Sequence, residues 1–581
     1  QSQSGANPPM LYGQTNSGLL YLVEPSGGKA EKVILPPPSL LPMRLASLKT
    51  TQGTDGNRVW VEVVTEDGDS GGKRSLPGFV LDGSLQARNF DMGSDALHDW
   101  RQFLLGTLGR GGNGLYMMDV SDHKNPKFMW YREKYGNQIV SMDKSSSFNA
   151  PVWLDSRGLS GNEAAWLKLG YAGASPAMGV VMKGGDADKP LTRNIIVVPG
   201  GLQTEVDISR NGGEGAVILI LDPKDGSVIK AFDGDALANG WRVGDRTVGR
   251  TPYMGMILSA PTLLSSGNSS SKYAQFISGH AYAADNRGNI FTISMEGKNG
   301  SPIPVQNWSV RTAATLQMRD ARGAGTDRNF AIPHGVAFKK EKDGTVWMVG
   351  GTANVEVKER GKIINGDGRT AQMLFSINTP LHPATGDGTI YRDDLHPLQT
   401  RSNDVMPPGR KGWYMALDTA VSAQHKIAGN EYVAARPIVR GKKMYAATFT
   451  VSNIDLSGVE DVCNASKSGV DGYSRLYAMD VSNGSNIWTA KDDSKMRFIQ
   501  IEGVKITGTT PLRNADGSST LVFTYELLSK DPFANSDFKE LAGKNGITRL
   551  SDNSLALYVQ KGRDSQAIPP EKTIIYYWIT N

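Results

Sequence analysis

Apolar runs of similar shape recur along the chain, and each is paired with an acidic residue that opens a turn. In the clearest copy an apolar run at residues 115–120 contains Asp119, a turn follows at residues 122–126, and a second short run ends on Trp130. Bulky apolar residues in such runs favour β-strands, and the residues between them favour a turn. Each copy therefore predicts one β-hairpin. Less regular copies lie at residues 18–27, 216–229, 281–291 and 475–488.

The strands of these hairpins carry bulky residues on both faces, so both faces must be covered by neighbouring sheets. Sheets stacked around a common axis provide that cover. The pattern predicts an all-β fold, a modified β-propeller of about seven blades, and the unequal spacing of the copies predicts long loop insertions. We expect residues 1–525 to form the propeller domain. Residues 526–581 are expected to form a tail that closes a blade or pairs with a partner.

The acidic residue that opens each turn has a predicted structural role. Its side chain can accept hydrogen bonds from amides of the turn two residues further on, while glycine takes the position that needs a positive φ. The recurrence of the acid together with the turn favours this role over catalysis. These structural turn acids are Glu24, Asp119, Asp222, Asp285 and Asp480.

Composition and charge exclude several classes of partner and site. The chain has 63 Lys and Arg against 58 Asp and Glu, a net charge of +5 over 581 residues, and no basic run, so no nucleic-acid partner is expected. Its one cysteine, Cys463, excludes an internal disulfide and metal sites built from several cysteines. No apolar run approaches the roughly 20 residues of a membrane-spanning helix. The polar start without an initiator Met predicts a processed or excised piece of something longer.

Candidate chemistry is sparse. Asp67 and Asp69 match the opening of a calcium-binding loop, but Gly78 stands at its twelfth position, where a bidentate Glu is wanted. The seven histidines are far apart in sequence and lack ligand spacing, so structural or surface roles are expected. No nucleophile elbow and no His-Glu-x-x-His motif is present. A pair of glycosidase carboxylates stays open, since its test is a separation in space.

Eight short segments, taken together and in order, resemble the C-terminal propeller of the PilY/PilC family of type IV pilus tip-associated adhesins and biogenesis factors. They include Gly-Gln-Thr-Asn-Ser-Gly at residues 13–18, Trp-Arg-Gln-Phe-Leu-Leu at 100–105 and Ala-Asp-Asn-Arg-Gly-Asn-Ile-Phe at 284–291. The resemblance covers most of residues 10–525. The other five segments are residues 79–84, 115–122, 258–261, 349–352 and 411–417.

The resemblance implies a non-enzymatic extracellular protein at the pilus tip. Such a protein would contact minor pilins, support pilus biogenesis and bind host or abiotic surfaces. Several relatives carry an aspartate-rich calcium loop at the position of Ser265 to Lys272, which holds no carboxylate here. We therefore expect that the family's calcium site is lost and that no cofactor is resident, with calcium at Asp67 and Asp69 left as the weak alternative.

Two alternatives differ in class. A quinoprotein-type dehydrogenase is one, because residues 476–488 resemble the tryptophan-docking repeat of those propellers; here only Trp130 and Trp488 close such a repeat. An outer-membrane assembly scaffold is the other. Recognition is predicted on loops rather than strands. The expected insertions are residues 51–75, 131–165, 312–330, 379–411 and 452–472, the last of which contains Cys463.

Overall fold

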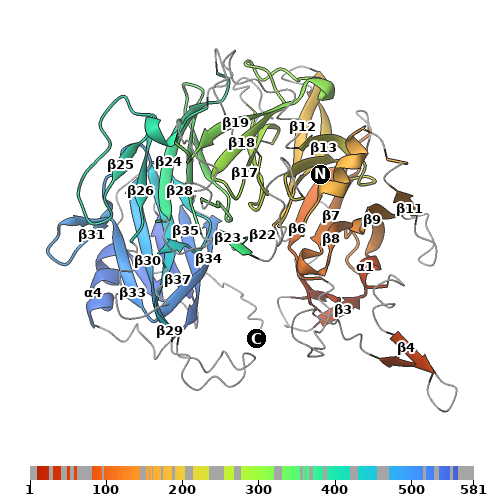
Figure 1. Cartoon of the computed structure of the whole chain (residues 1–581), viewed down its shortest axis with the longest axis horizontal. Coiled ribbons are helices and arrows are strands. Elements are labelled where there is room, and N and C mark those ends of the chain that lie inside the picture. Colours follow the sequence, from red (N-terminus) through yellow and green to blue (C-terminus); the bar gives the residue numbers. More distant parts are fainter. Residues whose placement is uncertain are drawn as a thin grey trace.

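The computed structural model is nearly all β, and its sheets follow one another around a ring in chain order (Figure 1). In Figure 1 the colours pass from orange on the right through green at the top to blue on the left. Seven of the sheets contain three or more strands and form the seven blades of a β-propeller, as the sequence predicted. The structure describes residues 10–559 except 17, 25–29, 41–48, 53–57, 62–80, 94–96, 136, 144–151, 156–157, 160, 172–173, 186–189, 203–213, 234–253, 267–275, 319–329, 354–356, 360–361, 366–370, 384–388, 419–429, 455–469, 514–517, 529–535 and 550–553.

The first two blades are antiparallel meanders of unequal size. The first has three strands and the second has six, and in both blades each strand pairs with the next described strand of the same blade. The first blade consists of β1 (Leu11–Gln14), β2 (Leu20–Val23) and β3 (Ala30–Ile34). The second consists of β6 (Leu85–Asp91), β7 (Trp100–Thr107), β8 (Asn113–Asp119), β9 (Lys127–Tyr135), β10 (Gln138–Asp143) and β11 (Val152–Asp155).

The third and fourth blades are regular four-stranded meanders in which sequential strands pair. The third consists of β12 (Ala177–Gly185), β13 (Pro190–Pro199), β14 (Val217–Leu221) and β15 (Val228–Asp233). The fourth consists of β16 (Thr262–Ser265), β17 (Ser278–Ala284), β18 (Asn289–Ser294) and β19 (Ser309–Thr315).

The last three blades depart from a simple meander. In the fifth, β25 pairs in parallel with β26, and in the seventh the last strand in sequence inserts beside β35. The fifth blade consists of β20 (Ala337–Lys340), β21 (Thr345–Gly351), β24 (Met373–Pro380), β25 (His396–Leu398) and β26 (Gly412–Ala416). The sixth consists of β27 (Tyr432–Val433), β28 (Ile438–Arg440), β29 (Lys443–Ile454), β30 (Val470–Asp480) and β33 (Phe498–Glu502). The seventh consists of β34 (Val504–Arg513), β35 (Ser519–Leu527), β36 (Ile547–Arg549) and β37 (Ser554–Val559).

Three two-stranded hairpins and a few short helices complete the described elements. The hairpins are β4 (Lys49–Gln52) with β5 (Arg58–Val61), β22 (Val357–Glu359) with β23 (Lys362–Asn365), and β31 (Trp488–Thr489) with β32 (Lys495–Met496). The helices are α1 (Pro37–Leu40), α4 (Ser536–Asn545), and the 3₁₀ turns η1 (Gly109–Gly111), η2 (Gly161–Lys168), η3 (Val305–Asn307) and η4 (Arg392–Asp394).

The hydrophobic core lies between consecutive blades, and β14 shows why the chain must stack its sheets. All five residues of β14 are buried. Val217, Leu219 and Leu221 pack in one cluster with the second blade, whereas Ile218 and Ile220 pack in another with the fourth. Because successive side chains of a strand point to opposite faces, a continuous apolar run needs a neighbouring sheet on each side.

Two of the predicted insertions belong partly to the blades. Residues 131–165 contain the end of β9, all of β10 and β11, and the start of η2, so much of this segment extends the second blade. Residues 379–411 contain β25, which adds to the fifth blade beside β26. Polar composition made both segments resemble surface loops, but strands at the edge of a blade need only one apolar face. Residues 547–549 and 554–559 of the predicted tail form β36 and β37 of the seventh blade.

Candidate functional site

Four of the five turn acids lie at blade corners and accept hydrogen bonds from turn amides. The Asp119 carboxylate accepts from the amide (3.0 Å) and hydroxyl (2.6 Å) of Ser121. Asp222 accepts from the Lys224 amide at 2.9 Å, and Asp480 accepts from the Ser482 amide at 2.8 Å. Each oxygen therefore fixes the bend of its own hairpin. Glu24 follows β2, and the turn residues after it lie outside the described residues.

Asp285 is the most deeply buried of these acids. Its Oδ1 accepts from the amides of Arg287 (2.9 Å) and Asn289 (2.8 Å), and its Oδ2 accepts from the Gly255 amide and Asn289 Nδ2, both at 2.8 Å. Burial raises the pKa of this carboxyl, and these hydrogen bonds offset part of that rise. The Asp285 oxygens are thus engaged in holding the turn to the backbone at Gly255.

Two tryptophans fasten a blade to the corner of the next. Trp130 in the second blade donates from Nε1 to the Pro223 carbonyl at 2.8 Å, and Trp413 in the fifth donates to the Val481 carbonyl at 3.1 Å. Both acceptors directly follow a turn acid, Asp222 or Asp480. Trp488, expected to close a repeat in the same way, donates instead to the Leu476 carbonyl within its own blade at 2.6 Å.

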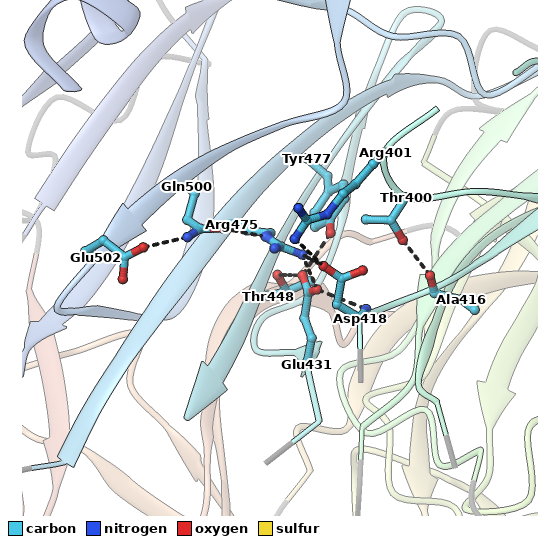
Figure 2. A network of polar contacts seen from close by, with 10 residues as sticks. All are labelled: Thr400, Arg401, Ala416, Asp418, Glu431, Thr448, Arg475, Tyr477, Gln500 and Glu502. Atoms are coloured by element: carbon cyan, nitrogen blue, oxygen red, sulfur yellow. Dashed lines mark hydrogen bonds and ion pairs between the residues drawn. The ribbon is translucent and has the colours of Figure 1, made fainter. Parts of the chain in front are cut away.

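A buried polar network joins the fifth and sixth blades around Arg475 (Figure 2). Arg475 Nη1 lies 2.8 Å from Asp418 Oδ2 and 2.7 Å from Glu431 Oε2. Its Nε donates to Gln500 Oε1 at 2.9 Å, and its guanidinium lies over the Phe498 ring, 4.3 Å from the centroid. The Arg475 side chain is 2% exposed and that of Glu431 is 0% exposed, so both charges are satisfied by each other rather than by water.

The electrostatic interactions in this network keep Arg475 positively charged. Burial by itself lowers the pKa of Arg475, but Glu431, Tyr477 and Asp418 together outweigh that effect and the net pKa is raised. Burial and the Glu431 charge both raise the pKa of Tyr477, whose hydroxyl donates to Glu431 Oε1 at 2.9 Å. Thr448 donates to the same oxygen at 2.6 Å. The Glu431 carboxylate therefore already accepts hydrogen bonds from several neighbouring side chains. This arrangement suits a structural ion pair better than proton transfer.

The network holds together the two ends of the segment 419–429, which itself lies outside the described residues. The Glu431 amide donates to the Asp418 carbonyl at 3.0 Å, and Arg475 contacts both side chains. Strands β29 and β30 stay paired up to the segment 455–469, and Ile454 pairs with Val470 on either side of that segment. The bases of two long connections are thus set by paired strands and a buried ion cluster.

Several predicted site residues fall outside the described part of the chain. Asp67, Asp69 and Cys463 are among them, as are residues 267–272 of the segment from Ser265 to Lys272. At the described start of that segment, Lys340 Nζ donates to the Ser266 carbonyl at 2.8 Å. No helix in the described ranges has the length and apolar character to cross a membrane.

One cluster of ligand-type residues has no signal in the sequence pattern. Among the described residues, His280, Glu296 and His382 form a group whose possible ligand atoms all lie within 4.8 Å of one another. The histidines were interpreted as isolated because His280 and His382 belong to different blades and are distant in sequence. A regular spacing in the sequence could not have revealed them, since these histidines meet only where the fourth and fifth blades pack together.

Sequence comparison finds similarity to two type IV pilus biogenesis factors. The chain is 26% identical over 244 residues to the type IV pilus biogenesis factor PilY1 homolog of Xylella fastidiosa, covering 42% of this chain and 16% of that protein. It is 27% identical over 222 residues to the type IV pilus biogenesis factor PilY1 of Pseudomonas aeruginosa, covering 37% and 13%. The matched segments thus span about a sixth or less of these relatives' length. No family profile matches.

A solved structure shares the fold. The C-terminal domain of Pseudomonas aeruginosa PilY1 superposes with a TM-score of 0.52 at 15% identity, covering 89% of this chain and 91% of that domain. Fold and corner geometry define a seven-bladed β-propeller whose blades are fastened through turn acids and tryptophans. Together with the sequence matches, they support the predicted resemblance to PilY1/PilC proteins.

Proposed function

We propose that the chain is a non-enzymatic interaction module in type IV pilus biogenesis and adhesion. The observation that carries this proposal is the pair of sequence matches to PilY1 biogenesis factors, over a fold shared with a PilY1 C-terminal domain. Its site of action would be the pilus tip or the outer cell surface. Its partners would be minor pilins and a host or abiotic surface.

The buried acids support a binding role over a catalytic one. The carboxylates of Asp285 and Glu431 each accept several hydrogen bonds within the protein, so neither is poised to exchange a proton with a substrate. Asp418, the more accessible acid at the blade junction, contacts Arg475 and Arg401. These groups stabilise the scaffold.

Recognition is assigned to the two connections with fixed bases, segments 419–429 and 455–469. Asp418 and Glu431 bracket the first, and Ile454 and Val470 bracket the second. Loops positioned by a rigid scaffold commonly carry binding residues, because the scaffold fixes where the loop starts and ends. The second segment lies within the predicted insertion 452–472 and contains Cys463.

The test replaces each segment in turn by a short Gly-Ser linker. The backbone hydrogen bond between Glu431 and Asp418 shows that a short linker can close the first gap, and the pairing of Ile454 with Val470 shows the same for the second. The control replaces residues 514–517, between paired Arg513 and Ser519, with a linker of the same composition. All three variants should keep the wild-type unfolding temperature.

Binding of purified minor pilins from the same bacterium is then measured by surface plasmon resonance. We expect that the 419–429 or 455–469 variant loses at least about tenfold in affinity, equivalent to about 1.4 kcal/mol, while the control binds as the wild type does. Equal binding by all variants would contradict the assignment to these loops. No pilin binding by the wild type would contradict the proposed partner.

A separate assay tests the enzyme alternative. The purified chain is incubated with a quinone cofactor and Ca²⁺, and alcohol-dependent reduction of an artificial electron acceptor is followed. We expect no turnover above that of the heat-denatured chain. Sustained turnover would establish the quinoprotein dehydrogenase class and end the non-enzymatic proposal.

A further inference from the structure

The junction between the fourth and fifth blades holds three metal-ligand side chains in close contact. His280 lies on β17, Glu296 follows β18, and His382 follows β24. His280 Nδ1 is 3.6 Å from Glu296 Oε1, and the two imidazole rings are 4.9 Å apart at their centroids with a 64° angle between planes. Two ligands bound tetrahedrally at about 2.0–2.2 Å from a zinc ion are themselves separated by roughly 3.4 Å. The 3.6 Å between His280 Nδ1 and Glu296 Oε1 is close to that separation.

The histidines have lone pairs and N–H groups that the protein does not satisfy. His280 is 0% exposed, yet neither of its ring nitrogens has a hydrogen-bond partner among the described residues, and the same holds for Nε2 of His382. Buried polar side-chain atoms in native proteins are usually paired, so such a cluster needs an explanation. A bound ion would use one nitrogen of each ring.

The third group, Glu296, is held in place by features that suit a ligand. Ser266 Oγ donates to Glu296 Oε2 at 2.5 Å, and the other oxygen, Oε1, is the one nearer to His280. Gly279 makes room for the carboxylate, because a Cβ there would come within 2.1 Å of Glu296 Cδ. An outer hydrogen bond that orients a ligand is typical of protein metal sites.

The surroundings select the class of ion. A neutral imidazole ligates a metal through a ring nitrogen, and both His280 and His382 have a buried ring nitrogen without a hydrogen-bond partner among the described residues. Glu296 is the one carboxylate of the group. A hard cation such as Ca²⁺ needs more oxygen ligands than this, whereas two imidazoles and one carboxylate suit zinc and similar transition ions.

We propose that His280, Glu296 and His382 bind one transition metal ion of the zinc class, with water at its remaining position. The ion would fasten the residues after β24 to strands β17 and β18, and so tie the fifth blade to the fourth. This site differs in ligand type from the calcium loop that several relatives carry at the position of Ser265 to Lys272, and Ser266 of that segment contacts its carboxylate. It does not depend on the proposed role in pilus biogenesis.

The test uses the whole chain, dialysed against a chelator and titrated with Zn²⁺ and, separately, Co²⁺. Bound metal per chain is measured by mass spectrometry, and Co²⁺ coordination by its visible absorption. The variants are His382→Gln and Glu296→Gln, with His396→Gln on β25 as the matched histidine outside the cluster. His382 is only partly buried, so its variant should fold, which unfolding in the absence of metal checks.

The wild type and His396→Gln should bind one ion per chain and unfold at a higher temperature when Zn²⁺ is added. His382→Gln and Glu296→Gln should bind at least about tenfold more weakly and lose that rise. Absence of stoichiometric binding by the wild type would overturn the proposal. Binding by His382→Gln as tight as that of the wild type would also overturn it, even if Glu296→Gln failed to fold.

Discussion

The indole ring of Trp130 lies directly against Gly226, across the junction between the second and third blades. A Cβ built on Gly226 would come within 2.8 Å of the ring, and the residue has φ +70°. The same indole donates to the Pro223 carbonyl of that turn. Trp413 repeats the hydrogen bond at Val481 between the fifth and sixth blades. The hairpin corner is therefore also the docking point for the preceding blade.

Gly226→Ala should destabilise the chain for two reasons that a control can separate. The added methyl group clashes with Trp130, and the left-handed conformation is unfavourable for alanine. We expect a loss of roughly 2–4 kcal/mol in the free energy of unfolding, measured by urea denaturation. Gly344→Ala, at φ +83° with nothing within 4 Å, should lose only about 1–2 kcal/mol. Equal losses in the two variants would show that the tryptophan contact is unimportant.

Arg475→Met should be among the most destabilising substitutions at the junction of the fifth and sixth blades. It leaves Glu431 buried without its cation, and breaking a buried ion pair costs about 3–5 kcal/mol. Arg401 contacts the same Asp418, but its side chain is 73% exposed. Arg401→Met should therefore cost no more than about 1 kcal/mol. Chemical denaturation of both variants at neutral pH measures the contrast. Similar losses would mean that the network does not act as a buried clamp.

The contribution of Asp418 should depend on pH in the acid range. Burial alone raises its pKa, but hydrogen bonds and charge from Arg475 and Arg401 outweigh burial and bring the pKa below its ordinary value. A carboxyl with a lowered pKa stabilises the folded state above its unfolded pKa of about 3.9, and that stability disappears as the pH falls through the folded value.

The measurement compares wild type and Asp418→Asn by urea denaturation between about pH 3 and pH 7. The difference in unfolding free energy should stay constant above about pH 5 and shrink below about pH 4. A difference that grew as the pH fell would have the wrong sign and would contradict the assigned charge state.

The propeller could be predicted from sequence because its cause is local. A run such as residues 217–221 is apolar at every position, so it demands two covered faces, and an acidic residue marks each corner. The predicted hairpin at residues 115–130 is β8 and β9. Trp413 could also have been found, since it stands in a run that ends with Asp418, but the residue that it would contact lies in the next blade.

The polar clusters could not be predicted because they are assembled where neighbouring blades pack together. Asp418, Glu431 and Arg475 come from separate strands of two blades, and no spacing rule links them. His280 and His382 meet for the same reason. Segments 131–165 and 379–411 were predicted as loop insertions, because an edge strand such as β25 is too short to show a periodic pattern.

The most direct test of the central claim is a count of surface pili in the bacterium that encodes the chain. Cells make the full-length protein either intact or without residues 10–559, and sheared surface pilin is compared with total pilin. We predict that the deletion sharply reduces surface pilin while total pilin and the level of the remaining protein stay unchanged. Normal surface piliation without the propeller would contradict a role for this chain in pilus biogenesis.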